Sequence, residues 1–175
     1  CNVNPQEYAD VLNGYFKSFN HPYKWFDRSE AALNGLGASY YDGEEIRAIH
    51  IDIRTPVATA QKWRKIGDKT VFEDGIKLFK NLVDELQPDI MIMPLGFEHI
   101  KMAWPEKLTW QPIGDGGLKT TKIKVGSKDC TLIKADNSDR GTYRWGKRGF
   151  MSENDILDGF SSIKQILKDD GIKLP

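Results

Sequence analysis

Two apolar runs with an amphipathic segment between them constrain the fold of this chain most strongly. Residues 46–53 are rich in β-branched side chains and end shortly before Pro56, which is typical of a buried strand. Residues 70–86 place their apolar side chains on one broad face and predict a helix, which Pro88 closes. Residues 89–95 form a second short apolar run. A strand, a helix and a strand within about 50 residues predict a right-handed crossover that joins parallel strands.

Two more helices are indicated before the first of these runs. Apolar side chains recur at helical spacing over residues 5–19, so a helix is expected to open the chain. Ser29 is expected to begin a short helix that ends near Gly35 or Gly37.

The later part of the chain predicts further strands, at residues 108–113, 120–125 and 130–134. Residues 126–129, Gly-Ser-Lys-Asp, lie between the last two runs and are typical of a hairpin turn, so part of the sheet is expected to be antiparallel. Ser152 and Asp155 are expected to cap a last helix, because side chains at this spacing can bond to free N–H groups of the first turn.

Size and composition allow one globular core. A chain of 175 residues with 39% hydrophobic and 11% aromatic residues can bury enough surface for it. We therefore expect one α/β domain over residues 1–175, built around a central, mainly parallel sheet. Lys plus Arg and Asp plus Glu number 25 each, so net charge neither favours nor excludes a polyanionic partner. No run of about 18 apolar residues predicts a membrane span, and no signal peptide is visible, so we expect a soluble chain without a membrane partner.

The two cysteines, Cys1 and Cys130, are too few for a disulfide scaffold and lack metal-ligand spacing. A reduced, intracellular setting is the simplest interpretation. A chain that starts at Cys1 is consistent with an artificially chosen fragment boundary, with missing upstream residues or with a processed lipoprotein. The first two are favoured, because no Ser/Gly-rich tether of the kind that a lipid anchor needs follows Cys1.

The loops after the expected strands are the places to search for chemistry, because ligands in open α/β sheets bind outside the carboxyl ends of strands. Four polar loops qualify, at residues 2–5, 52–56, 95–96 and 136–141. His50 and His99 show no metal-ligand spacing, so we interpret both as structural residues and expect no metal. No phosphate-binding glycine loop or nucleophile elbow is present, and no cofactor is expected.

Taken in order, these loops resemble those of the uracil-DNA glycosylase superfamily, especially its mismatch-specific and single-strand-selective branches. Asn4-Pro5 is similar to the family's first motif, and residues 21–26, His-Pro-Tyr-Lys-Trp-Phe, are similar to its aromatic loop. Residues 49–56 are similar to the strand that ends in a base-reading residue and a proline. Residues 87–96 match the next strand and its glycine, and Asn137-Ser138 the late loop. The family's first strand precedes the Asn-Pro motif, so we expect some upstream sequence to be missing.

The resemblance, which spans nearly the whole chain, implies a three-layer α/β/α sandwich and a monofunctional DNA glycosylase. Such an enzyme hydrolyses the N-glycosidic bond of a flipped base in DNA repair. The implied partner is DNA, single- or double-stranded, and the expected state is a monomer in the cytoplasm or associated with the nucleoid. Two other classes stay open: a non-catalytic module of the same fold that binds nucleic acid or protein, and an extracytoplasmic lipoprotein beginning at Cys1.

The resemblance also assigns roles to single residues. Asn4 would position the water that attacks the anomeric carbon, and Ser138 would act in the catalytic late loop, with Asn137 beside the substrate. Phe26, or otherwise Trp25, would stack on the flipped base. The residues alone leave other interpretations open, because Asn4-Pro5 also fits the entry turn of a helix and either ring also fits a hydrophobic core.

Asp52 departs from the family, which commonly has Asn at this base-reading position. An ionised Asp only accepts hydrogen bonds, so it would repel the carbonyl face of uracil and favour an exocyclic amine, as on cytosine or adenine. We therefore expect an amino-bearing or modified base as the substrate. Alternatively, Asp52 caps a helix or pairs with Arg54 or His50.

The late loop departs further, because Asp136-Asn137-Ser138 lacks the family's His and Pro. That His would stabilise the departing base anion, which an Asp opposes, so help would have to come from elsewhere, such as Arg140. Otherwise the fold has kept its shape without this catalytic step. The segment that follows is basic and aromatic, which suits DNA as well as it suits a solvated surface loop. Its candidate contacts to the DNA backbone are Arg140, Arg144, Lys147 and Arg148.

Overall fold

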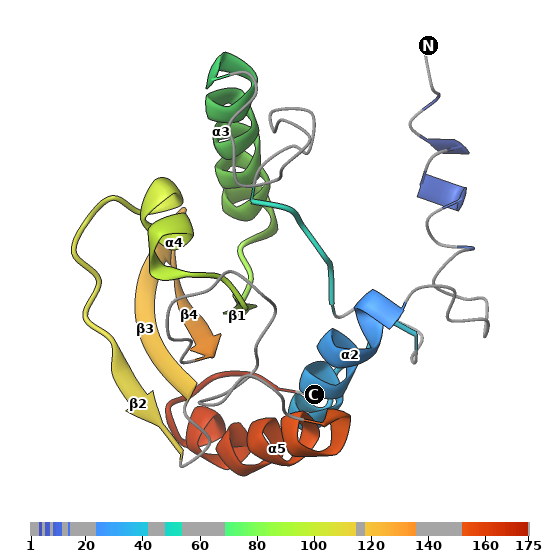
Figure 1. Ribbon diagram of the computed structural model, residues 1–175, viewed down its shortest axis with the longest axis vertical. Coiled ribbons are helices and arrows are strands. Elements are labelled where there is room, and N and C mark those ends of the chain that lie inside the picture. The colour runs from blue at the N-terminus through green and yellow to red at the C-terminus, as the bar shows by residue number, and fades with distance from the viewer. Residues whose placement is uncertain are drawn as a thin grey trace. The chain divides into compact units, whose positions relative to one another are not determined.

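The protein is described by a computed structural model (Figure 1) that covers residues 4, 6–7, 9–11, 14, 24–41, 48–53, 69–114, 118–135 and 152–174. The chain divides into two compact units. Unit 1 comprises Cys1–Ile49 and Ser152–Pro175, and unit 2 comprises His50–Met151. The expectation of a single domain over residues 1–175 stays a prediction.

Unit 2 is built on a four-stranded sheet with the order β1-β4-β3-β2. Its strands are β1 (Ile90–Ile92), β2 (Gln111–Ile113), β3 (Leu118–Val125) and β4 (Lys128–Ala135). β1 and β4 are parallel, whereas β4 pairs with β3, and β3 with β2, in antiparallel fashion. The α/β class is therefore confirmed. The expectation of a mainly parallel sheet is wrong, because two of the three strand pairs in this sheet are antiparallel.

The β3–β4 hairpin follows from its turn residues. Val125 lies opposite Lys128, so Gly126 and Ser127 form a two-residue turn. Gly126 has a φ of 56°, a left-handed conformation that glycine adopts without steric cost. The hairpin predicted from this turn is confirmed, and β1 and β2 lie within the apolar runs predicted as strands over residues 89–95 and 108–113.

Residues 48–53 form no strand, so the strand predicted over residues 46–53 is wrong over its described part. The crossover predicted from it is wrong as well, because the parallel neighbour of β1 is β4. Two apolar side chains of the segment nevertheless reach the core, whereas Ile49 is 58% exposed. Ile53 is 9% exposed and belongs to the core of unit 2, and Ile51 packs against that core. The β-branched run therefore indicated partial burial here rather than strand pairing.

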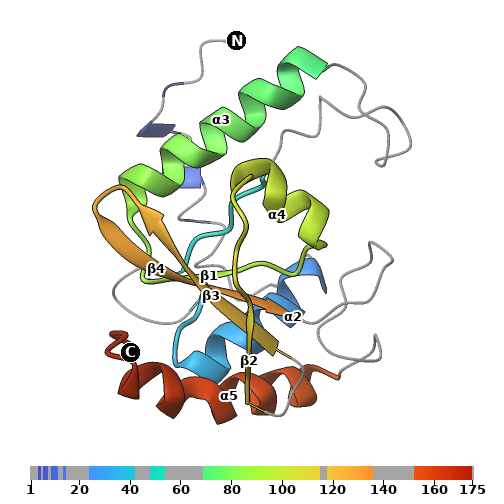
Figure 2. The same ribbon diagram turned by 90° about the vertical axis from the view of Figure 1, so that its left-hand side faces the viewer.

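Two helices, α3 (Lys69–Leu86) and α4 (Phe97–Ala103), cover one face of the sheet (Figure 2). α3 confirms the helix predicted over residues 70–86. α4 was not indicated by periodicity, because its seven residues bury only Ile100 and Ala103. The buried residues of this core are Ile53, Phe79, Val83, Met93, Ile100, Ala103, Trp104, Ile123, Val125, Cys130 and Leu132.

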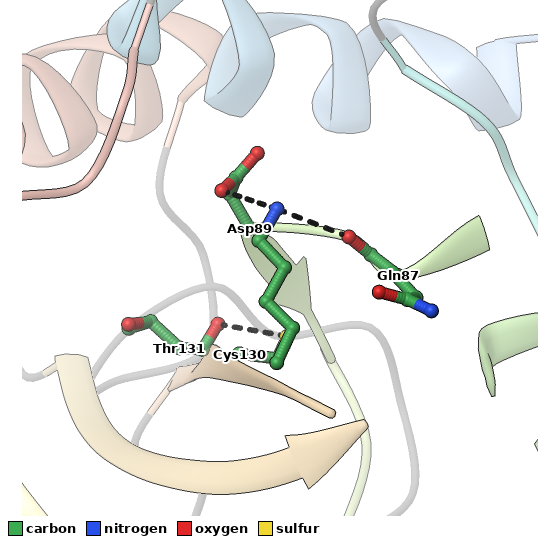
Figure 3. Close-up of polar contacts among 5 residues, drawn as sticks. Gln87, Asp89, Cys130 and Thr131 are labelled. Atoms are coloured by element: carbon green, nitrogen blue, oxygen red, sulfur yellow. Dashed lines mark hydrogen bonds and ion pairs between the residues drawn. The ribbon is translucent and has the colours of Figure 1, made fainter. Parts of the chain in front are cut away.

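Polar contacts join the end of α3 and the start of β1 to the hairpin turn. Gly126 N donates to Asp84 Oδ1 over 3.1 Å. Lys128 Nζ lies 2.7 Å from Asp89 Oδ1 and donates to Gln87 O over 3.3 Å, and Figure 3 shows Asp89 and Gln87 with the dashed lines that mark these contacts. Next to this pair, burial and the nearby Asp89 carboxylate raise the pKa of the Cys130 thiol to about 12, so this buried cysteine is a neutral packing residue rather than a nucleophile.

Unit 1 pairs the helices α2 (Lys24–Leu36) and α5 (Glu153–Asp169), which pack against each other. α2 begins five residues before the Ser29 start that we expected and continues to the predicted end. α5 buries Ile156, Phe160, Ile163 and Leu167 on one face, and its predicted cap at Ser152 and Asp155 is confirmed as a capping box.

The helices of unit 1 approach each other closely at Gly35, and we expect Gly35→Ala to destabilise the protein by about 1–3 kcal/mol. A Cβ atom at Gly35 would lie 2.6 Å from Phe160 Cβ and 2.7 Å from Leu157 O, so one backbone has to move. Gly14→Ala is the matched control, because Gly14 is helical and a Cβ atom there meets nothing within 4 Å. Urea unfolding of both variants measures the difference, and equal stabilities would contradict this packing.

The cap of α5 predicts a pH dependence of stability. Ser152 Oγ and N donate to Asp155 Oδ2 over 2.7 and 2.8 Å. These bonds, the hydroxyl first, hold the pKa of Asp155 below its usual value. Their stabilisation is complete above the unfolded-state pKa of about 3.9 and is lost as the pH falls through the lower folded-state pKa.

Asp155→Asn tests this pH dependence, because the amide removes the charge and keeps the shape. We expect the variant to lower the Tm at neutral pH and to lower it progressively less towards about pH 2, where the wild-type carboxyl is itself neutral. Thermal unfolding followed by circular dichroism at several pH values provides the measurement. A Tm difference that stays constant over this range would show that the charge contributes nothing.

Candidate functional site

The carboxyl ends of β1 and β4 lie at the same edge of the sheet, where ligands usually bind in α/β proteins. Ile92 lies opposite Ile133, and Met93 N donates to Ile133 O over 2.8 Å, which extends the ladder by one step. The chain leaves β1 through residues 94–96 and leaves β4 after Ala135. Two of the four predicted site loops, residues 95–96 and 136–141, therefore start from neighbouring strands, although residues 136–151 lie outside the described part of the chain.

Cationic and aromatic side chains gather at this edge. We call Phe97, Trp110, Lys119 and Lys134 the edge cluster. Lys134 Nζ lies 4.1 Å from the centroid of the Phe97 ring, and Lys119 Nζ lies 5.9 Å from it. Phe97 in turn meets Trp110 edge to face, with centroids 5.4 Å apart and an interplanar angle of 72°. Each ammonium group lies within the range in which an aromatic quadrupole attracts a cation.

Lys134 is the most unusual member of the edge cluster, because its relative exposure is 0%. Burying an ammonium group costs several kcal/mol unless neighbouring groups replace its water. The Phe97 ring is one such group. Lys119 lies directly opposite Lys134 in the β3–β4 ladder, a pairing of like charges that neighbouring groups have to offset. The structure therefore places two lysines beside an aromatic pair, at the edge where ligands usually bind in α/β proteins.

The start of α4 positions Phe97. Gly96 is the N-cap of this helix, and His99 N and Ile100 N both donate to Gly96 O. Glu98 lies in the first turn, where a carboxylate interacts favourably with the helix dipole. His99 Nε2 lies 3.7 Å from Glu98 Oε1, an ion pair when the imidazole is protonated.

Asp52 lies on the irregular segment of residues 48–53, between two isoleucines that pack on the core. Its side chain is 67% exposed, and its Oδ1 lies 3.6 Å from His50 Nε2, an ion pair when the imidazole is protonated. The alternative that Asp52 pairs with His50 is therefore realised. Ile51 and Leu95 pack against the same core, so the Asp52 segment and the loop after β1 both border the hydrophobic centre of unit 2.

Phe26 lies on α2 in an aromatic group of unit 1. Its half-buried ring meets Tyr40 edge to face, with centroids 5.5 Å apart, and Tyr40 meets Tyr41 in the same way. Burial, the Glu30 carboxylate and Tyr41 raise the pKa of Tyr40 to about 12. Glu30 also accepts hydrogen bonds from the Ser39 hydroxyl and from Tyr40 N. Phe26 is thus held by a neighbouring ring, and only part of it remains exposed for a ligand.

Asn4 has the geometry of a helix cap. Its Oδ1 accepts a hydrogen bond from Gln6 N over 3.0 Å, and residues 6–7 and 9–11 are helical. This is the helix-entry interpretation that the sequence had left open. The proposed role of Asn4 in holding a water stays a prediction.

The remaining predicted site residues cannot be described. Trp25 lies in α2, but its side chain is outside the described part of the structure. The late-loop residues lie outside the described ranges altogether: Asn137, Ser138, Arg140, Arg144, Lys147 and Arg148. Asn4 and Phe26 belong to unit 1 and Asp52 to unit 2, so the convergence of these residues on one site stays a prediction.

The edge cluster was missed by the sequence reasoning. Lysine usually lies at the surface, so Lys134 was interpreted only as the last residue of a predicted strand, and Lys119 was assigned to no element. The available signal was an aromatic residue, Phe97, directly after the glycine that follows a predicted strand. Among the described residues, no three His, Cys, Asp or Glu side chains lie close enough to hold a metal ion.

Comparisons of the chain with protein-family models, with curated proteins and with solved structures gave no match. None of the helices in the described ranges is long and apolar enough to cross a membrane.

The edge cluster predicts a ranking of two substitutions at Lys134. Lys134→Met keeps the volume and removes the charge, whereas Lys134→Glu places a carboxylate against the negative face of the Phe97 ring. We expect Lys134→Glu to be less stable than Lys134→Met by about 2 kcal/mol or more. Lys122→Met and Lys122→Glu, at an exposed position on β3, are matched controls that should differ little. Chemical denaturation of the four variants checks the ranking, which equal stabilities of the Lys134 pair would refute.

Proposed function

We propose that this chain is a divergent uracil-DNA glycosylase-like hydrolase with a three-layer α/β/α fold, acting on an amino-bearing or modified base in DNA. In this reaction, water adds to the anomeric carbon of the sugar. The base leaves with the electron pair of the N-glycosidic bond and takes up a proton. The products are an abasic site and a free base, and no oxidant or reductant is consumed.

The edge cluster is the observation that supports this proposal best. A flipped base requires flat apolar surface to replace the stacking that it loses, and the DNA backbone requires positive charge. Phe97 and Trp110 are partly exposed rings beside Lys119, which is also partly exposed. This combination lies where two neighbouring parallel strands end, at the edge from which the late loop departs.

In this proposal Lys134 takes over the role of the histidine that the late loop lacks, which is to stabilise the departing base. A positive charge held in a poorly solvated place stabilises negative charge that develops nearby more strongly than the same charge in water. In this proposal the buried ammonium of Lys134 acts through its field on the departing base. Phe97 holds the Nζ atom in place at 4.1 Å from its centroid.

Asp52 is the proposed base-reading residue. Its exposed carboxylate can accept a hydrogen bond from an exocyclic amine, and the imidazole Nε2 of His50 lies 3.6 Å from its Oδ1. The flanking isoleucines anchor the segment in the core, so the carboxylate is presented on a supported loop. A base with a carbonyl oxygen at the same place would bring this hydrogen-bond acceptor against the Asp52 carboxylate, which also only accepts, so the two would repel.

A non-catalytic nucleic-acid-binding module is the second candidate, and the geometry of Asn4 favours it. The Asn4 side-chain oxygen already accepts from Gln6 N, so one of its two lone pairs is used to cap a helix. A cap of this kind needs no catalytic explanation. Both candidates predict binding to DNA, and only the first predicts release of a base.

An excision assay separates the two candidates. Oligonucleotides that carry uracil, cytosine derivatives or adenine derivatives at one position, in single and double strands, are incubated with the whole chain and treated with alkali. The enzyme should leave cleavable abasic sites, with the amino-bearing bases excised faster than uracil. Binding that weakens steeply with salt but releases no base would support the module instead, and neither binding nor excision would overturn both.

Asp52→Asn tests the base-reading role. The amide can donate as well as accept, so we expect the preference between amino-bearing base and uracil to shift towards uracil by about tenfold or more in kcat/KM. Asp129→Asn is the matched control, because Asp129 is exposed on β4 and pairs with Lys124 over 2.7 Å. An unchanged preference in Asp52→Asn would remove Asp52 from the site without touching the hydrolase proposal.

A further inference from the structure

α3 carries two rows of apolar side chains, and only one of them is used by the core. Phe72, Phe79 and Val83 form the buried row. A second row has the same helical spacing and remains exposed at 37% for Val71, 60% for Leu78, 41% for Leu82 and 45% for Leu86. Successive residues of an α-helix are rotated by about 100°, so this second row runs beside the first along the whole helix.

The exposed row is too regular to be a scatter of surface leucines. Its residues follow one another at intervals of seven, four and four, the spacing at which a helix presents one continuous stripe to a partner helix. Gly75 lies in the same stripe and carries no side chain, so a partner can approach the backbone there. Single exposed apolar residues need no explanation, but a contiguous stripe indicates a binding surface.

Charge on the open side of this stripe indicates what kind of partner it fits. The core lies on one side of the stripe. On the other side lie Asp74, four residues before Leu78, and Glu85, seven residues after it. Both carboxylates are exposed, and neither pairs with another described residue. The other acids of α3 are engaged elsewhere, since Glu73 lies 3.8 Å from Lys69 Nζ and Asp84 accepts from Gly126 N.

We infer that the exposed face of α3 docks an amphipathic helix of another protein, which lays an apolar row along Val71, Leu78, Leu82 and Leu86 and places Lys or Arg against Asp74 and Glu85. A second copy of the chain is a less suitable partner for this face of α3. In an antiparallel pair of identical helices, equal edges face each other, so the two acidic edges would meet and repel. The surface is independent of the edge cluster and of any reaction there.

Two synthetic helices of about 20 residues test this inference, because shorter peptides are marginally helical. Both carry the same leucine row, one with Lys and the other with Glu along the matching edge. Each labelled peptide is titrated with the whole chain and followed by fluorescence anisotropy. The Lys peptide should bind at least about tenfold tighter than the Glu peptide. Asp74→Lys combined with Glu85→Lys should reverse this order.

Substitutions in the stripe complete the test. Leu78→Glu and Leu82→Glu should each weaken binding of the Lys peptide by about tenfold or more without loss of helical circular dichroism, because both side chains are already largely exposed. Leu157→Glu, at a 37% exposed position on α5, is the matched control and should bind as the wild type does. Equal binding of both peptides, no binding of either, or self-association of the chain that Leu78→Glu abolishes would each overturn the inference.

Discussion

The parallel register of β1 and β4 is the constraint on which the described architecture of unit 2 depends. β1 has three residues and, among the described strands, one neighbour, so few ladder hydrogen bonds hold it. Thr131 N donates to Asp89 O at one end and Met93 N donates to Ile133 O at the other, so the short ladder is fixed on both sides. This register decides where the loop to α4 begins, and with it where Phe97 meets Lys134.

Short sequence patterns were sufficient to predict the elements that depend only on interactions between residues close in sequence. The period of the apolar residues in α3, the glycine at the start of the hairpin turn and the hydroxyl and carboxylate that cap α5 each act within a few residues. The strand expected over residues 46–53 failed for the opposite reason. A β-branched run signals that side chains are buried, but whether the backbone pairs depends on a partner far away in sequence. β4 occupies the place beside β1 that this run was expected to take.

The same distinction applies to the candidate site. Asp52 was proposed because it stands at the base-reading position of the resemblance, and its side chain is 67% exposed. Lys134 could not be found, since nothing in a run of Leu, Ile, Lys and Ala says that the lysine is enclosed by an aromatic ring from another element. The environment of Lys134 is created by the β1–β4 register and by α4. Because α4 has only seven residues, its apolar side chains show no helical periodicity in the sequence. Sites assembled from distant segments are therefore least visible in the sequence when each segment contributes a single residue.

The pairing of α2 with α5 has a consequence for how the chain is made. The whole of unit 2 lies between these helices in sequence, so during synthesis α2 leaves the ribosome long before its partner exists. Unit 2 can begin to form its own core during this interval, because its described strands and helices precede α5 in the chain. Unit 1, by contrast, closes one of the longest loops that the chain allows, a step whose entropic cost makes it slow even when the final contact is close. Until α5 has been synthesised, α2 lacks the helix against which it packs in the folded protein.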